Sequence, residues 1–234
     1  MEEPLPERGV ILRAAVGIGL YALAFGASVG AFAVGSGLTL AQTMVLSVVM
    51  FTGASQFAFV GVAASGGSPF AALLASLLLG VRNAFYGVPV SEILHPRGLA
   101  RLWTAHFVID ETTAMAISQS SPRARRYAFW ATGLILFSLW QLGNFAGAMV
   151  GRAVNPSDIG LDAAAPAVFL ALLWPGLRRR PARWAALGGA VVALALVPVA
   201  PPGIPVVAAA GVALVAGLLP QREPAEQSEE REVT

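Results

Sequence analysis

Four ionisable residues that lie in or beside long apolar segments are the positions most able to do chemistry. They are Arg82, His106, Asp110 and Glu111. If such segments lie in a membrane, an ionisable side chain is costly there and marks a functional site by default. The guanidinium of Arg82 could hold a carboxylate through two parallel hydrogen bonds. Arg82 could equally pair with an acid such as Asp110, Glu111 or Glu92, or extend its charge to the membrane surface, so a structural role stays open.

The acidic residues Asp110 and Glu111 are adjacent in the chain. On a helix, adjacent side chains diverge by about 100°, so only one of the two can face a given cavity. His106 precedes Asp110 by four residues and would share its face on a continuous helix, which allows a hydrogen bond or a proton relay. A solvated helix on the cytoplasmic surface explains the three residues equally well.

A second polar group is Gly53-Ala54-Ser55-Gln56-Phe57, inside another apolar segment. The side chains of Ser55 and Gln56 need hydrogen-bond partners in hydrocarbon. Gly53 can interrupt a helix and expose backbone groups that bind the ends of a zwitterion. Asn83, next to Arg82, joins the binding candidates. The alternative is ordinary polar packing between helices.

Several function classes lack support in the sequence. There is no Cys, only two His and none of the enzyme motifs that we sought, so neither an enzyme nor a cofactor or metal site is expected. A net charge of +2 is too small and too dispersed to indicate binding of nucleic acid.

The elements that must position these residues are membrane helices. The 234 residues are 56% hydrophobic and only 12% charged, about half the charge of a soluble domain. Five of the Asp, Glu and Arg residues precede Ala14 and seven follow Pro220, which leaves long apolar stretches between them. This pattern is typical of an all-α, polytopic membrane bundle.

Seven segments approach the length of about 20 apolar residues that a spanning helix needs. They lie near 12–34, 39–63, 69–91, 127–150, 162–177, 184–199 and 203–220. Leu99–Ser118 is an eighth span, a re-entrant segment or a surface helix, so we predict seven or eight transmembrane segments. Residues 1–11 form a short N-terminal segment and 12–220 a single transmembrane domain. The acidic residues 221–234 form a disordered tail.

Arginine counts do not decide between the two topologies. Eight spans with the N-terminus inside, and seven with it outside, both place eleven arginines inside and three outside. Both place the cluster from Arg178 to Arg183 and the C-terminus in the cytoplasm.

Glycines spaced by four residues predict close helix packing, either within the bundle or against another subunit. They are Gly26, Gly30, Gly143, Gly147 and Gly151, with Gly53 as a further packing candidate. Each of the two Gly-rich segments is followed by a Gly-Leu pair, at Gly37 and Gly160. Either a duplication of one half of the chain or chance explains this repeated pattern, and the sequence does not distinguish the two.

An ordered set of motifs over about residues 10 to 220 resembles one family, the large subunit of bacterial branched-chain amino-acid exporters of the AzlC type. The motifs are Ser47 to Phe51 leading into Gly53-Ala54-Ser55-Gln56-Phe57, Arg82 with Tyr86-Gly87, Asp110-Glu111, Trp140-x2-Gly143-x3-Gly147-x3-Gly151, and Gly160-Leu161-Asp162 leading into Pro166 to Leu173. The family often has Asn two residues before the Arg and His or Tyr just after it. In this sequence Gly80 and Asn83 occupy these two positions. This difference from the family affects the identity of the substrate more than the fold.

The resemblance implies a secondary transporter that exports Leu, Ile, Val and sometimes Met, coupled to the proton motive force, in the bacterial inner membrane. It also implies a small hydrophobic partner subunit of the AzlD type. Arg82 would then receive the carboxylate of the substrate, and Asp110 or Glu111 its ammonium group or a coupling proton. The alternatives are a transporter of another small metabolite and a non-catalytic scaffold subunit, in which these charges only join helices.

Overall fold

A computed structural model of the chain describes residues 8–153, 170, 173–174, 176–178, 180–201 and 203–218. Every regular element in these residues is a helix, which confirms the predicted all-α membrane-type bundle. The chain divides into two compact units, Met1–Phe169 and Leu170–Thr234. The predicted tail at 221–234 and most of the predicted span at 162–177 lie outside the described residues.

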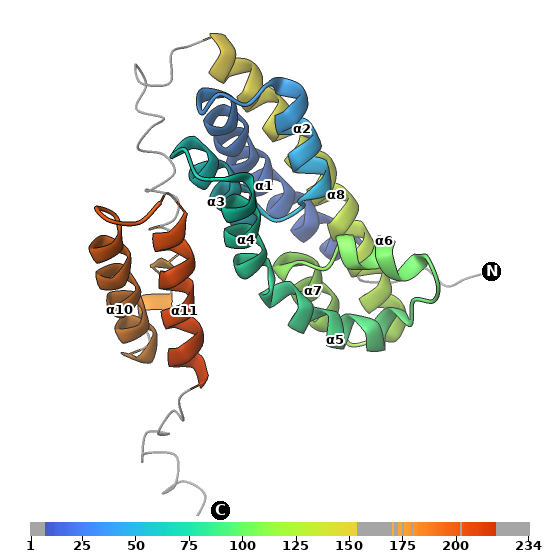
Figure 1. Ribbon diagram of the computed structural model, residues 1–234. Helices are drawn as coiled ribbons and strands as arrows, with labels where there is room; N and C mark the ends of the chain where they lie inside the picture. The colour runs from blue at the N-terminus through green and yellow to red at the C-terminus, as the bar shows by residue number, and fades with distance from the viewer. Residues whose placement is uncertain are drawn as a thin grey trace, which may run out of the picture. The chain divides into compact units, whose positions relative to one another are not determined.

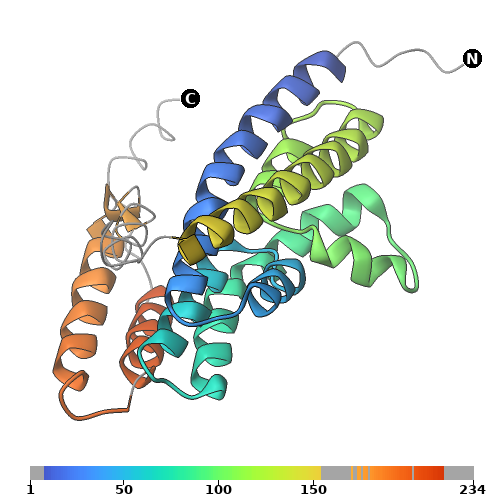
Figure 2. The same ribbon diagram turned by 90° about the horizontal axis from the view of Figure 1, so that it is seen from above.

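The first unit is built on two long helices, α1 (Arg8–Gly35) and α8 (Pro122–Ala153), which lie side by side (Figures 1 and 2). Both are long and apolar enough to cross a membrane. The helices α4 (Pro69–Gly80) and α5 (Arg82–Leu94) follow each other with a bend of 44° between them. If the two together form one broken span, they give a third membrane crossing. Length and composition therefore give two or three spans in the described residues, and the count of seven or eight stays a prediction.

Close contact between α1 and α8 depends on their glycines. A β-carbon on Gly143 or Gly147 of α8 would overlap the backbone of α1, and one on Gly30 of α1 would overlap the backbone of α8. Gly151 and Gly26 are in similarly tight positions, with backbone oxygens 2.9 Å from where their β-carbons would stand. Small residues let two helix backbones approach in this way, which gives dispersion contacts that lipid cannot replace.

Three of the apolar segments are interrupted in the structure. The segment 39–63 forms α2 (Leu40–Val49) and α3 (Gly53–Ala64), and 69–91 forms α4 and α5. Leu99–Ser118 forms α6 (Ala100–His106) and α7 (Asp110–Ile117). Helices of seven and eight residues are about 10–12 Å long, so neither crosses a membrane of about 30 Å alone.

Tertiary contacts and local sequence both contribute to these breaks. Thr52 is extended before Gly53, and the neighbouring Phe51 is buried against the rings of His106 in α6 and Phe137 in α8. Ile109 is extended too, and α7 then starts with Asp110 and Glu111, whose negative charges suit the positive end of a helix. At the third break, Gly80 lowers helix propensity just before Val81.

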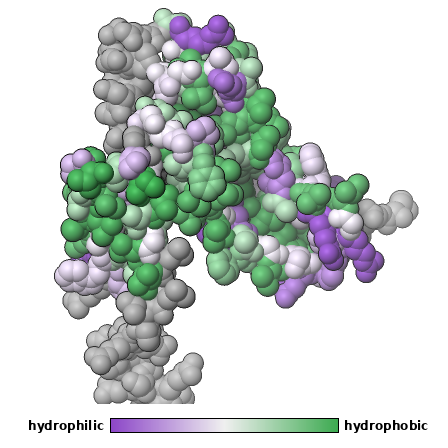
Figure 3. All heavy atoms as spheres, viewed as in Figure 1, coloured by the Kyte–Doolittle hydropathy of each residue, from purple (hydrophilic) through white to green (hydrophobic). Residues whose placement is uncertain are grey.

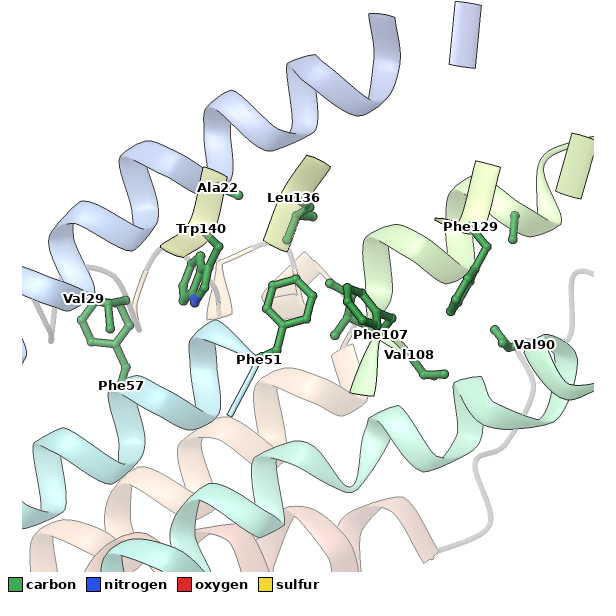
Figure 4. Close-up of a cluster of buried hydrophobic side chains, with 12 residues drawn as sticks. Ala22, Val29, Phe51, Phe57, Val90, Phe107, Val108, Phe129, Leu136 and Trp140 are labelled. Carbon is green, nitrogen blue, oxygen red and sulfur yellow. The ribbon is translucent and has the colours of Figure 1, made fainter. Parts of the chain in front are cut away.

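A band of aromatic rings forms the centre of the first unit. Figure 4 shows Phe57, Trp140, Phe51, Phe107 and Phe129 along it. Phe51 of the α2–α3 break meets Phe107 edge-on, with ring centroids 5.8 Å apart. These rings fix the break within the core. On the face drawn in Figure 3, apolar side chains cover much of the first unit, and hydrophilic residues lie at the end that carries α5 and α6 and also at the opposite end.

The second unit contains the short 3-10 helix η3 (Gly176–Arg178) and a pair of helices, α10 (Arg180–Leu196) and α11 (Ile204–Leu218). Gly188 and Gly189 of α10 face α11, where β-carbons on them would lie 3.1 Å from Val212 and 3.4 Å from the carbonyl oxygen of Ala209. The predicted segments at 184–199 and 203–220 correspond to these two helices.

Candidate functional site

The three helix breaks of the first unit meet one another. Phe51, in the α2–α3 break, lies with its ring centroid 5.9 Å from that of His106, the last residue of α6. Arg82, the first residue of α5, forms an ion pair with Asp110, the first residue of α7, with 3.2 Å between Nη1 and Oδ2. The α6–α7 break therefore contacts both other breaks.

The α4–α5 break also lies next to the α2–α3 break. A β-carbon on Gly80, the last residue of α4, would lie 3.4 Å from the hydroxyl oxygen of Ser55 in the first turn of α3. The starts of α3, α5 and α7 and the ends of α2, α4 and α6 consequently surround one region. Such a region offers N–H groups with partial positive charge and carbonyl groups with partial negative charge.

The three helix starts in this region lack a side-chain cap, as does the start of α6 at Leu99, whereas three other starts of the unit have one. Thr39, Ser68 and Ser121 cap α2, α4 and α8 by accepting a hydrogen bond from a backbone N–H in the first turn. The starts of α3, α5 and α7 have no such side-chain cap, because Val81 and Ile109 lack an acceptor and Thr52 does not use its own. At the start of α3, the N–H groups of Gly53, Ala54 and Ser55 have no acceptor among the described residues.

The ion pair is only partly covered by protein. The side chains of Arg82 and Asp110 are 51% and 40% exposed. Glu111 follows on α7 and is half-buried, as is His106, which lies among aromatic rings. His106 and Asp110 belong to different helices, so the face that they would share on one helix is not formed.

A buried polar network lies beside the breaks, between α2, α3 and α8. Gln56 Nε2 donates to Asn144 Oδ1 at 3.1 Å, and Gln141 Nε2 donates to the carbonyl oxygen of Ser47 at 3.2 Å. Several buried polar atoms of this region have no hydrogen-bond partner among the described residues: Ser47 Oγ, Ser55 Oγ, Gln56 Oε1, Asn83 Oδ1, Trp140 Nε1 and Gln141 Oε1. Buried polar atoms without a hydrogen-bond partner are rare in protein cores, and a bound ligand or water molecule is a common reason for them.

The structure thus brings Ser55, Arg82, Asp110 and His106 to the breaks and places Gln56 in the neighbouring network. Asn83 lies in the first turn of α5. The packing candidates lie at the α1–α8 contact, except Gly53, whose β-carbon would meet the rings of Phe25 and Trp140. The sequence indicated a possible interruption at Gly53, but not the uncapped start at Thr52 or the contact that Asn144 makes with Gln56. The dipeptide Thr52-Gly53 inside an apolar segment was the signal for that start.

In the described residues the region lacks a group of three residues that could hold a metal ion. The region combines a cation, an anion and both kinds of helix end in a mostly apolar surround. Helices interrupted at the level of a polar site are the way that many transporters bind small charged substrates. The fold and this site define an integral membrane helical protein with discontinuous helices.

The chain belongs to the AzlC family, whose family model, described as "AzlC protein", matches residues 17–154. "Inner membrane protein YgaZ" of Escherichia coli K12 is 29% identical, over 73% of this chain and 72% of that protein. "Branched-chain amino acid transport protein AzlC" of Bacillus subtilis 168 is 22% identical, over 71% and 66%. An "Uncharacterized membrane protein" of Helicobacter pylori 26695 is 24% identical, over 74% and 78%. No solved structure matches the chain.

Proposed function

We propose that the chain is the large subunit of a secondary transporter that exports branched-chain amino acids across the bacterial inner membrane. The observation that carries the proposal is the meeting of the Arg82–Asp110 pair with three uncapped helix starts. The Bacillus subtilis relative, which is named as a branched-chain amino acid transport protein, supports the substrate class.

In this proposal a zwitterion replaces the ion pair. The substrate carboxylate binds the guanidinium of Arg82, and its ammonium group binds the carboxylate of Asp110 or Glu111. Both charges then keep a partner of opposite sign during the exchange. The aromatic and aliphatic wall accepts the side chain of Leu, Ile, Val or Met. One methylene changes such binding by only about 1–3 kcal/mol, so selectivity among small apolar amino acids is broad.

Coupling to the proton motive force is part of the proposal. Asp110, Glu111 and His106 lie within or next to the α6–α7 break and are the groups that could carry a coupling proton. A small hydrophobic membrane subunit of the AzlD type completes the complex, and the C-terminus of the large subunit lies in the cytoplasm.

The test is leucine efflux from cells preloaded with a leucine-containing dipeptide, with and without the chain and a co-expressed small subunit. We expect faster efflux that a protonophore abolishes. Equal efflux in both strains, with the complex shown to be inserted in the membrane, would rule out the branched-chain assignment.

Arg82→Ala then separates a transporter from a scaffold. A transporter loses efflux while assembling normally with its partner, whereas a scaffold whose charges only join helices loses assembly.

A further inference from the structure

The start of α3 has the features of a second contact for the substrate. We propose that the N–H groups at this start, together with the hydroxyl group of Ser55, bind one oxygen of the substrate carboxylate while Arg82 binds the other. The inference rests on the proposed function, because it assigns a part of the same site.

The first observation is the unused cap. Thr52 has a side chain that caps helices well, and Thr39 does so at the start of α2. At the start of α3, Thr52 makes no side-chain cap, and the N–H groups of Gly53, Ala54 and Ser55 have no acceptor among the described residues. Three free donors at the positive end of a helix favour an anion.

The second observation is the side chain of Ser55 itself. Ser55 is 2% exposed, and its hydroxyl oxygen has no hydrogen-bond partner among the described residues. Side chains in a helix lean toward its N-terminus, so a hydroxyl group in the first turn is directed to the free N–H groups. A buried hydroxyl group without a partner costs free energy, which a bound carboxylate would recover.

The third observation is the absence of a side chain opposite Ser55. Gly80 is the residue whose β-carbon would come to 3.4 Å from the Ser55 oxygen, and it lies two residues before Arg82. Because Gly80 carries no side chain, no β-carbon from this position contacts the hydroxyl oxygen of Ser55. In the proposal, the start of α3 and the start of α5 then contact the same small anion.

The experiment compares two ligands that differ at the carboxylate. Binding of L-leucine and of L-leucinamide, which keeps the ammonium group and the side chain, is measured on the purified full-length chain with its small subunit in nanodiscs. We expect leucine to bind at least tenfold more tightly than leucinamide. Ser55→Ala should weaken leucine binding about tenfold, because it removes a hydrogen bond to a charged group, and should weaken leucinamide binding much less, because the amide oxygen is a neutral acceptor.

Ser76→Ala is the matched control. Ser76 is buried in α4, but its hydroxyl group already donates to the carbonyl oxygen of Leu73 at 2.8 Å, so leucine binding should not change. Ser55→Thr keeps the hydroxyl group and should retain leucine binding. If Ser55→Ala fails to fold, Gly80→Ala serves instead, since its methyl group fits at ordinary contact distance and should weaken leucine binding selectively.

The outcomes separate the inference from the function on which it rests. Leucine binding that survives both Ser55→Ala and Gly80→Ala, or a loss that is equal for leucine and leucinamide, overturns the carboxylate contact and leaves the transporter standing. A folded wild-type complex that binds neither ligand overturns both.

Discussion

At the scale of single residues, the Arg82–Asp110 pair has the character of an exchangeable contact. Both side chains are partly exposed, and pairs of this kind contribute about 0–1 kcal/mol to stability. We therefore expect Arg82→Gln to change the free energy of unfolding by less than about 1 kcal/mol. Leucine export should nevertheless fall at least tenfold, because the charge that binds the carboxylate is lost.

The matched control for this prediction is Arg101→Gln, on α6. Arg101 is exposed, and its Nε donates only to the carbonyl oxygen of Pro96, so export should be normal. A large loss of stability in Arg82→Gln, with export per folded molecule unchanged, would show that the pair is structural.

Glycine at position 147 is a second residue-scale requirement. Its β-carbon would overlap the backbone of Ala27, which cannot move aside as a flexible side chain can. We expect Gly147→Ala to destabilise the protein by about 1–3 kcal/mol or more, since overpacking forces α1 and α8 apart. Gly17→Ala in α1 adds a β-carbon that meets no atom within 4 Å and should be neutral or slightly stabilising. Thermal unfolding in detergent measures both, and equal melting temperatures would contradict the packing argument.

At the scale of elements, two helix starts with capping side chains should respond differently to substitution. Ser68 accepts a hydrogen bond from the N–H of Ala71, so Ser68→Ala should cost about 1 kcal/mol of stability. Thr52 makes no side-chain cap, so Thr52→Ala should cost only a few tenths. Thermal unfolding of the two variants decides this. A larger loss for Thr52→Ala would mean that the start of α3 is capped in solution.

Hydropathy predicted the long elements well and the interrupted ones poorly. The segments 12–34 and 127–150 correspond to α1 and α8, because a run of apolar residues is enough to specify a long membrane helix. The break at Phe51 depends on aromatic contacts with α6 and α8, which are distant in the chain. Phe51 is apolar, so it raises the summed hydropathy of the segment just as a residue inside a helix would. The summed hydropathy therefore cannot show that the helix is interrupted there.

The residues of the candidate site were also predictable from the sequence only in part. The cost of a charge in an apolar segment was enough to single out Arg82, Asp110 and Glu111. This cost does not indicate which acidic residue pairs with Arg82. The structure shows that the partner is Asp110. The bond between Gln56 and Asn144 joins residues 88 apart in sequence, a pairing that no local spacing contains.

At the scale of the whole molecule, the orientation of the chain is open to direct measurement. The cluster from Arg178 to Arg183 predicts a cytoplasmic C-terminus by the positive-inside rule. The chain has no Cys, so Ser228→Cys in the tail introduces a single labelling site. In intact cells we expect labelling by a membrane-permeant maleimide and none by an impermeant one. Labelling by both reagents would place the tail outside and reverse the topology.

The central claim is that interrupted helices meeting at Arg82 and Asp110 form an amino-acid transport site. Its most direct test is counterflow of radiolabelled leucine in proteoliposomes that contain the purified chain and its small subunit. We expect vesicles preloaded with unlabelled leucine to accumulate the label. Complexes with Arg82→Gln or Asp110→Asn should lose this accumulation while keeping the wild-type melting temperature. A correctly inserted wild-type complex without counterflow, or undiminished counterflow in both variants, would contradict the central claim.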